Sequence, residues 1–178
     1  SISAWFLPVA GLLIVFLYRI SGMGQDKGTN RIIQSAGGEE RVPLRLAPLI
    51  FLSTILTHLC GGSAGREGAA LQIGGSLGDN LARLFRMDMD DRRVLVMCGM
   101  GAAFSAVFGT PMAAALFPLE MVTVGMMYYS ALVPCVVSSF VASQFAAGMG
   151  IHPQTFIVRE IPSIAFDSVG KIIVVGIG

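Results

Sequence analysis

Residues 61–75 read GGSAGREGAALQIGG, a glycine-rich run that places one basic and one acidic residue inside an otherwise apolar stretch. The charged residues are the neighbours Arg66 and Glu67, and alanine, leucine and isoleucine follow them. Glycine adopts backbone conformations that other residues avoid, and a long apolar run after a glycine-rich turn favours a helix. The pattern predicts a helix that begins beside Glu67.

Long stretches without charge surround this run. Hydrophobic residues make up 54% of the 178-residue chain. Charged residues make up 13%, whereas about a quarter of the residues of ordinary globular domains are charged. Asp, Glu, Lys and Arg are all absent from residues 1–18, 46–65, 94–119 and 121–158. Because a helix of about 20 mostly apolar residues crosses a bilayer, each stretch can hold a membrane span. We therefore expect an all-α integral membrane protein.

Glycine and proline interrupt the apolar runs, which divides the chain into short elements. We expect spans at 4–19 and 128–148, a short polar segment at 22–34, a charged loop at 37–45, apolar helices at 48–59, 68–85 and 94–108, an aqueous loop at 86–93, a helix from Thr110-Pro111 to Glu120, a loop at 151–166 and a last helix from Asp167. Several are too short to cross a bilayer. Broken helices within a membrane are tolerated where they line a cavity or are buried by protein, and in transporters they mark the substrate site.

Small residues recur four positions apart, which lets membrane helices approach closely. They are Gly74 and Gly78, then Gly101, Ser105 and Gly109, and finally Ser138, Ala142 and Ala146. We interpret them as packing positions within the chain.

Composition argues against other classes of protein. A net charge of +1 gives no support to nucleic-acid binding. The sequence shows no nucleophile–base pair, metal cluster or phosphate loop with its lysine, so neither an enzyme nor a cofactor is expected. Cys60, Cys98 and Cys135 have no metal-ligand spacing and are interpreted as small buried residues.

Two glycine-bracketed points are each expected to lead into a helix. The first turn of a helix has unpaired N–H groups and a partial positive charge, so two converging N-termini can hold an anion without a lysine or a metal. The candidate anion-binding residues are Gly22, Met23, Gly24, Gly65, Arg66, Glu67 and Gly68. Thr29 and Asn30 are further candidates to face the site.

Glu67 has two possible roles. An ionised carboxylate at a helix N-terminus can occupy the place of the anion, and on protonation it can swing out, so that one residue gates the pathway and carries a proton. Alternatively, Glu67 only complements the helix dipole. An ionisable group in apolar surroundings is a functional candidate, which favours the first role.

Three motifs together resemble one family. Residues 65–75 are similar to the GREGP-xVQ-x-G signature of the CLC anion channels and exchangers. Residues 99–113, GMGAAFSAVFGTPMA, resemble the family's GAAAGLAAAFNAPLAG stretch, and residues 116–120, LFPLE, resemble its LFxxEE end. The motifs occur in the family's order, and the resemblance covers nearly the whole chain.

The resemblance implies a homodimer in the lipid bilayer, with a separate pore in each subunit and two inverted repeats of tilted, broken helices. Residues 1–178 would form part of this transmembrane domain, with the first repeat ending near residue 150 and the start of the second within 151–178. Glu67 would be the external gating glutamate, and the segments after Thr110 and Tyr128 would contribute to the dimer interface. A bacterial inner membrane is the expected location.

Three positions depart from the family pattern. Met23 stands where a serine hydroxyl donates to chloride, and a thioether cannot donate. Ala69 replaces a proline, and at the possible internal side Glu120 remains while Met121 replaces the proton-transfer glutamate. These departures resemble the fluoride-transporting branch, which implies fluoride export coupled to proton import. The alternatives are a chloride channel or a chloride/proton exchanger of the same family, or an incomplete chain without transport of its own.

Overall fold

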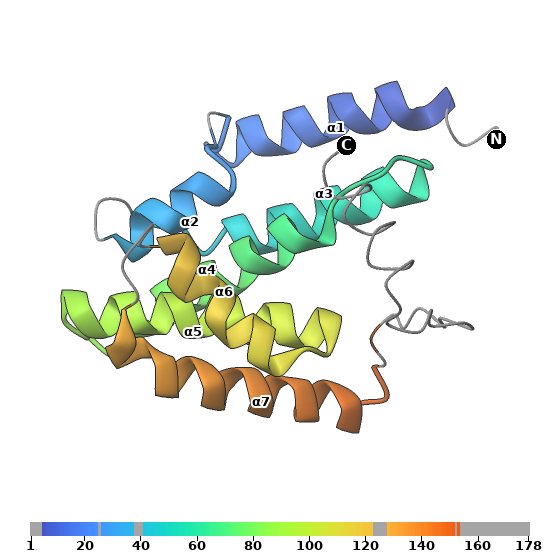
Figure 1. The fold of residues 1–178 in the computed structure, drawn as a ribbon. Coiled ribbons are helices and arrows are strands. Elements are labelled where there is room, and N and C mark those ends of the chain that lie inside the picture. Colours follow the sequence, from blue (N-terminus) through green and yellow to red (C-terminus); the bar gives the residue numbers. More distant parts are fainter. Residues whose placement is uncertain (1–4, 25, 38–40, 123–127, 152, 154–178) are drawn as a thin grey trace, which may run out of the picture.

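The computed structural model describes residues 5–24, 26–37, 41–122, 128–151 and 153, and all regular secondary structure among them is helical. In chain order the helices are α1 (Leu7–Ile20), α2 (Thr29–Ala36), α3 (Leu46–Leu59), α4 (Arg66–Leu84), α5 (Met89–Phe108), α6 (Pro111–Val122), the 3-10 helix η2 (Tyr129–Ala131) and α7 (Leu132–Gly148) (Figure 1). Apart from Ile151 and Pro153, the loop and final helix expected over 151–178 lie outside the described residues.

Local sequence accounts for several helix starts. The predicted restart at Thr110-Pro111 is confirmed, because α6 begins at Pro111, the helical position where proline's missing N–H costs nothing. The helix expected after the glycine-rich run is also confirmed, and it begins at Arg66 with Gly65 as N-cap. Glu67 therefore lies in the first turn of α4, as predicted.

The expected aqueous loop at 86–93 is confirmed only for the exposed residues 86–88, and residues 89–93 are helical instead. Helix α5 begins at Met89, and the Asp88 side chain caps it by accepting a hydrogen bond from the Asp91 N–H at 2.9 Å. Asp90 and Asp91 lie in the first turn, where negative charge is favourable. The dense charge therefore marks a helix N-terminus.

Helices α4 and α5 form the most extensive helix contact of the described chain, and α5 packs in turn against α6 and α7. Small residues make this closeness possible. A methyl group on Gly74 would overlap the carbonyl of Gly99, and one on Gly78 would overlap the carbonyl of Leu95. The interpretation of Gly74 and Gly78 as packing positions is confirmed.

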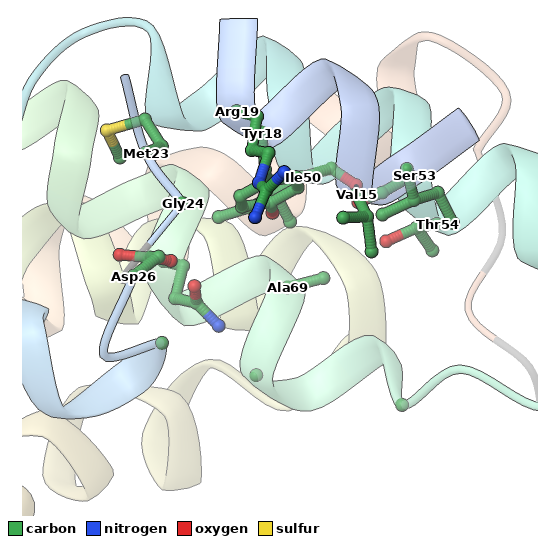
Figure 2. A pocket seen from close by; sticks show the side chains of 15 residues that line it. Val15, Tyr18, Arg19, Met23, Gly24, Asp26, Ile50, Ser53, Thr54 and Ala69 are labelled. Carbon is green, nitrogen blue, oxygen red and sulfur yellow. Dashed lines mark hydrogen bonds between the residues drawn. The ribbon is translucent and has the colours of Figure 1, made fainter. Parts of the chain in front are cut away.

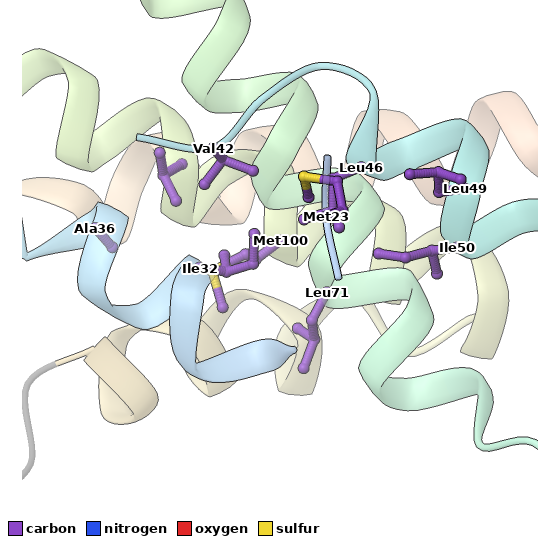
Figure 3. Close-up of a cluster of buried hydrophobic side chains, with 10 residues drawn as sticks. Met23, Ile32, Ala36, Val42, Leu46, Leu49, Ile50, Leu71 and Met100 are labelled. Atoms are coloured by element: carbon purple, nitrogen blue, oxygen red, sulfur yellow. The ribbon is translucent and has the colours of Figure 1, made fainter. Parts of the chain in front are cut away.

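A cluster of buried side chains joins the loop after α1 to α2, α3, α4 and α5 (Figure 3). Its members are Met23, Ile32, Ala36, Val42, Leu46, Leu49, Ile50, Leu71, Val96 and Met100. Ile32, Leu46 and Met100 are completely buried. The cluster fixes the short helix α2 against the two longer helices α4 and α5.

Two arginines of α5 hold the C-terminal end of α2. Arg93 of α5 donates from Nε to the carbonyl oxygen of Ala36 at 2.8 Å and from Nη2 to that of Gly37 at 3.3 Å. Arg92 donates to Ser35 Oγ at 3.4 Å. Cations at a helix C-terminus satisfy its last carbonyls and complement its dipole. The C-terminal end of α2 is therefore fixed against α5.

The outer surface of the described chain is strongly apolar. Trp5, Leu12 and Phe16 on or beside α1 and Val133 and Phe145 on α7 are each more than half exposed. Within the described ranges, one continuous helical segment, Tyr129–Gly148, is long and apolar enough to cross a membrane, with a mean hydropathy of 1.6. The apolar helices α1, α3 and α6 are shorter.

Candidate functional site

A cavity of about 780 Å³ lies between α1, the loop that follows it, α3 and the first turns of α4 (Figure 2). Figure 2 shows Met23 and Asp26 at one end of it and Ser53 and Thr54 at the other. The full lining is Ile14, Val15, Tyr18, Arg19, Met23, Gly24, Asp26, Gly28, Ile50, Ser53, Thr54, Gly65, Gly68, Ala69 and Gln72. The cavity thus brings together two segments that lie some forty residues apart in the chain and that both entered the predicted site.

The glycines at 22–24 do not lead into a helix, which corrects the prediction for this segment. Gly22 has φ = +72° and follows the last turn of α1. Its N–H donates to the carbonyl of Arg19 at 3.1 Å, and the Met23 N–H donates to that of Tyr18 at 2.8 Å. This pair of bonds is the Schellman motif of a helix C-terminus, in which glycine supplies the positive φ. The N–H groups of Gly22 and Met23 are therefore occupied by α1.

The N-terminus that meets the cavity from this side belongs to α2. Its N-cap is Gly28, with φ = 59°, and its first residue is Thr29. Thr29 Oγ1 accepts a hydrogen bond from Gln72 Nε2 of α4 at 3.3 Å. Gly28, Gly68 and Gln72 all line the cavity. Two helix N-termini converge, as predicted, but the first one is formed by Gly28 and Thr29.

The second N-terminus lies where the sequence placed it. Gly65 is the N-cap of α4 in an extended conformation, and no side chain of the described residues caps this end with a hydrogen bond. Gly65, Gly68 and Ala69 line the cavity. The first turn of α4 therefore borders the cavity, where its N–H groups and partial positive charge favour an anion.

The remaining predicted residues lie elsewhere. Arg66 and Glu67 have exposed side chains and are not among the described residues that line the cavity. Glu120 is exposed near the end of α6. Met121 packs against the buried cluster that contains Met23, and it does not reach the described lining either. Asn30 is exposed.

Met23 forms part of the cavity wall and of the core. Its side chain is 6% exposed and belongs to the cluster of Figure 3. Nη1 of Arg31 lies 3.6 Å from the Met23 sulfur. A thioether offers the cavity no hydrogen-bond donor, so the wall at this point is apolar.

Sequence reasoning missed Asp79, Gln72 and Gly28. Asp79 is fully buried in α4 and pairs with Arg92 of α5. The available signal was an isolated acidic residue in the middle of a long helical run. If such a carboxylate is buried, it needs a positively charged partner. For Gly28 the signal was its place directly before the polar start of a helix, where glycine is one of the favoured N-caps.

Metal ligation receives no support from the described part of the chain, where no group of three or more His, Cys, Asp or Glu side chains is placed to hold an ion.

The sulfur atoms of Cys98 and Cys135 lie 3.7 Å apart between α5 and α7. Cys135 is buried, as predicted, whereas Cys60 and Cys98 are only partly buried.

The chain is similar in sequence to known anion channels and transporters. The family model described as voltage gated chloride channel matches residues 10–178. A chloride/fluoride channel protein of Pseudomonas syringae pv. tomato is 42% identical over 174 residues, which cover 97% of this chain and 38% of that protein. The H(+)/Cl(-) exchange transporter ClcA of Citrobacter koseri is 33% identical over 120 residues, covering 65% of this chain and 25% of the transporter.

A solved structure has the same fold. The crystal structure of a CLC-type fluoride/proton antiporter superposes with a TM-score of 0.87 at 33% sequence identity, covering 97% of this chain and 44% of that one. The chain thus spans less than half the length of these relatives. The match to the family model extends from α1 to the end of the chain, and so this protein belongs to the voltage-gated chloride channel family, the CLC proteins.

Proposed function

We propose that the full-length protein exports fluoride across the membrane in exchange for protons. The observation that carries the proposal is the meeting of Met23 with the N-termini of α2 and α4 at one cavity. The relative named as a chloride/fluoride channel protein and the neighbour named as a fluoride/proton antiporter support the same substrate.

An anion in the cavity would meet the positive ends of two helices, which take the place of a metal ion or a lysine. Backbone N–H groups at the first turns of α2 and α4 point toward the start of each helix, and the macrodipoles add about half a positive charge at each end. Arg19 also lines the cavity. In apolar surroundings these charges act more strongly than in water, so the site would concentrate small anions.

Met23 is proposed to decide between anions. In its place a serine hydroxyl would donate a hydrogen bond to chloride, whereas the thioether leaves the anion to the backbone N–H groups. The proposal that fluoride is preferred follows from this departure together with the resemblance to the fluoride-transporting branch.

Glu67 is proposed as gate and proton carrier. It stands in the first turn of α4, next to Gly68 of the cavity wall, and its side chain is exposed in this part of the protein. An ionised carboxylate is attracted to the same helix end as a halide and would compete with it. Protonation removes that attraction, so the movement of Glu67 would couple the passage of an anion to that of a proton.

The main alternative is an uncoupled chloride channel. Met121 packs against the core cluster, and its thioether can neither bind nor release a proton. If the second half of the protein supplies no proton-carrying residue in its place, protons would have no internal path. The homodimer and the bacterial inner membrane implied by the family resemblance also remain proposals.

The experiment that tests the function is anion efflux from liposomes that hold the complete protein, with fluoride and chloride compared and external pH recorded. Fluoride efflux with opposing proton movement and little chloride efflux is expected. Chloride efflux without proton movement would instead support the uncoupled channel.

A further inference from the structure

Arg31 of α2 contacts two residues of the cavity wall with a single nitrogen atom. Its Nη1 lies 3.4 Å from Asp26 Oδ1 and 3.6 Å from the sulfur of Met23. Asp26 and Met23 both line the cavity (Figure 2), whereas Arg31 is not among the described lining residues. The guanidinium is therefore in contact with the wall from outside the cavity.

The ion pair is largely removed from solvent. The side chains of Asp26 and Arg31 are 10% and 17% exposed. A backbone hydrogen bond of 3.1 Å from the Asp26 N–H to the Met23 carbonyl holds these two wall residues in one turn. Asp26 Oδ1 has no hydrogen-bond donor among the described residues, so Arg31 balances its charge mainly as an ion. Salt screens such a buried pair much less than a surface pair.

We propose that Asp26 and Arg31 form an electrostatic pair that sets the anion affinity of the cavity, an inference that rests on the proposed anion transport. While both charges are present they nearly cancel at the wall. Loss of the Asp26 charge leaves the wall one unit more positive, which attracts halides. Loss of the Arg31 charge leaves a carboxylate on the wall, which repels them. Arg19, the other charged residue of the described lining, is unchanged in both cases.

The first test measures transport by the complete protein in liposomes for Asp26→Asn, Arg31→Gln and the double variant. We expect the half-saturating fluoride concentration to fall about tenfold in Asp26→Asn and to rise about tenfold in Arg31→Gln. Each change corresponds to about 1.4 kcal/mol in the free energy of anion binding. The double variant should return to within about threefold of the parent protein, because removing both charges restores the near-zero net charge of the pair. Changes of the same sign in both single variants would overturn the proposal.

Arg31→Lys separates charge from shape. It keeps the positive charge but loses the planar guanidinium, so the half-saturating concentration should stay within about threefold of the parent value. A rise as large as that of Arg31→Gln would mean that packing against Met23, and not charge, is what matters, and would contradict the proposal.

A second readout does not depend on transport. A cysteine introduced by Ser53→Cys lies on the cavity wall, and its rates of reaction with an anionic and a cationic methanethiosulfonate reagent report the local potential. Modification at position 53 is identified by mass spectrometry, since Cys60, Cys98 and Cys135 are also free. The ratio of the anionic to the cationic rate should rise about tenfold with Asp26→Asn and fall about tenfold with Arg31→Gln.

Lys27→Gln is the matched control. Lys27 is exposed and donates to Gln34 Oε1 at 3.2 Å, and it does not belong to the described lining. It loses the same charge as Arg31→Gln, yet the rate ratio should stay within about twofold. The proposal is disproved if Lys27→Gln lowers the rate ratio as much as Arg31→Gln does. It is also disproved if the protein transports anions but neither Asp26→Asn nor Arg31→Gln shifts the ratio. If the ratios shift as expected but the parent protein transports no anion, the pair stands and the proposed function fails.

Discussion

Arg92 of α5 and Asp79 of α4 form an ion pair inside the protein, where the Asp79 side chain is fully buried and that of Arg92 is 10% exposed. Asp79 Oδ2 also accepts a hydrogen bond from the Val42 N–H at 2.9 Å and lies 3.0 Å from Nη2 of Arg83. Arg92 reaches onward to Ser35 at the end of α2. One carboxylate therefore links α4, α5 and the chain at Val42, and through Arg92 it fixes the helix whose other end meets the cavity.

Replacing Asp79 by Asn should lower the stability of the complete protein by about 3 kcal/mol or more, since it leaves the buried Arg92 without its counter-ion. The measurement is thermal unfolding in detergent, followed by intrinsic fluorescence. Arg83→Gln is the control, because Arg83 touches the same carboxylate but is 36% exposed, and exposed pairs contribute about 0–1 kcal/mol. Equal losses in the two variants would show that burial of the pair is not what makes it stabilising.

This pair also shows where sequence reasoning ends. Arg92 and Asp79 are thirteen residues apart, and Arg92 and Ser35 are fifty-seven apart. The local sequence shows that residues 86–93 are rich in charge. It does not show which of these side chains face water and which pair with a buried group. The helix starts at Arg66 and Pro111 were predictable because glycine and proline act through their own backbone conformation.

The glycines before α2 illustrate a second limit. Glycine is favoured both at the C′ position after a helix and at an N-cap, so the run 22–24 reads equally as an end or a beginning. The structure assigns Gly22 to the end of α1 and Gly28 to the start of α2. Convergence of two N-termini could be predicted from the pattern, whereas the residues that form the first one depend on how α1 ends.

The contact between α4 and α5 should not tolerate a side chain at Gly74. An added methyl group would overlap the Gly99 carbonyl and lie 2.7 Å from the Ala103 side chain, so Gly74→Ala should force the helices apart. Overpacking of this kind costs about 1–3 kcal/mol, and unfolding in detergent should occur at a lower temperature.

Gly11→Ala is the control for this prediction. Gly11 lies within α1, and a methyl group there meets nothing within 4 Å among the described residues. Alanine is a better helix former than glycine by about 1 kcal/mol, so this variant should be neutral or more stable. Unfolding of Gly74→Ala at or above the parent temperature would disprove the close packing of α4 on α5.

Met23→Ser should shift anion preference toward chloride. The hydroxyl adds a hydrogen-bond donor to the cavity wall, and a hydrogen bond to a charged group contributes about 1.5–3 kcal/mol. Because a hydroxyl can donate to either halide, the direction of the shift rests on the proposed role of Met23, in which serine at this position binds chloride. The ratio of chloride to fluoride efflux from liposomes should then rise about tenfold. Met23→Leu is the control, since it keeps an apolar side chain of similar volume and should preserve the parent ratio. An unchanged preference in Met23→Ser would remove Met23 from the account of selectivity.

Glu67→Gln should abolish proton coupling while anions still move. Glutamine has nearly the shape of glutamic acid but binds no proton in the working pH range, so it would act as a permanently neutral gate at the first turn of α4. In liposomes the ratio of proton to fluoride flux should fall at least tenfold.

Asp90→Asn is the control for Glu67, because Asp90 is also an exposed carboxylate in the first turn of a helix, and it does not belong to the described lining of the cavity. If Glu67 carries the external proton, Asp90→Asn should keep the parent flux ratio within about twofold. Proton movement at the parent ratio in Glu67→Gln would mean that the carboxylate only complements the dipole of α4, and then the coupling residue would have to be sought elsewhere in the full-length protein.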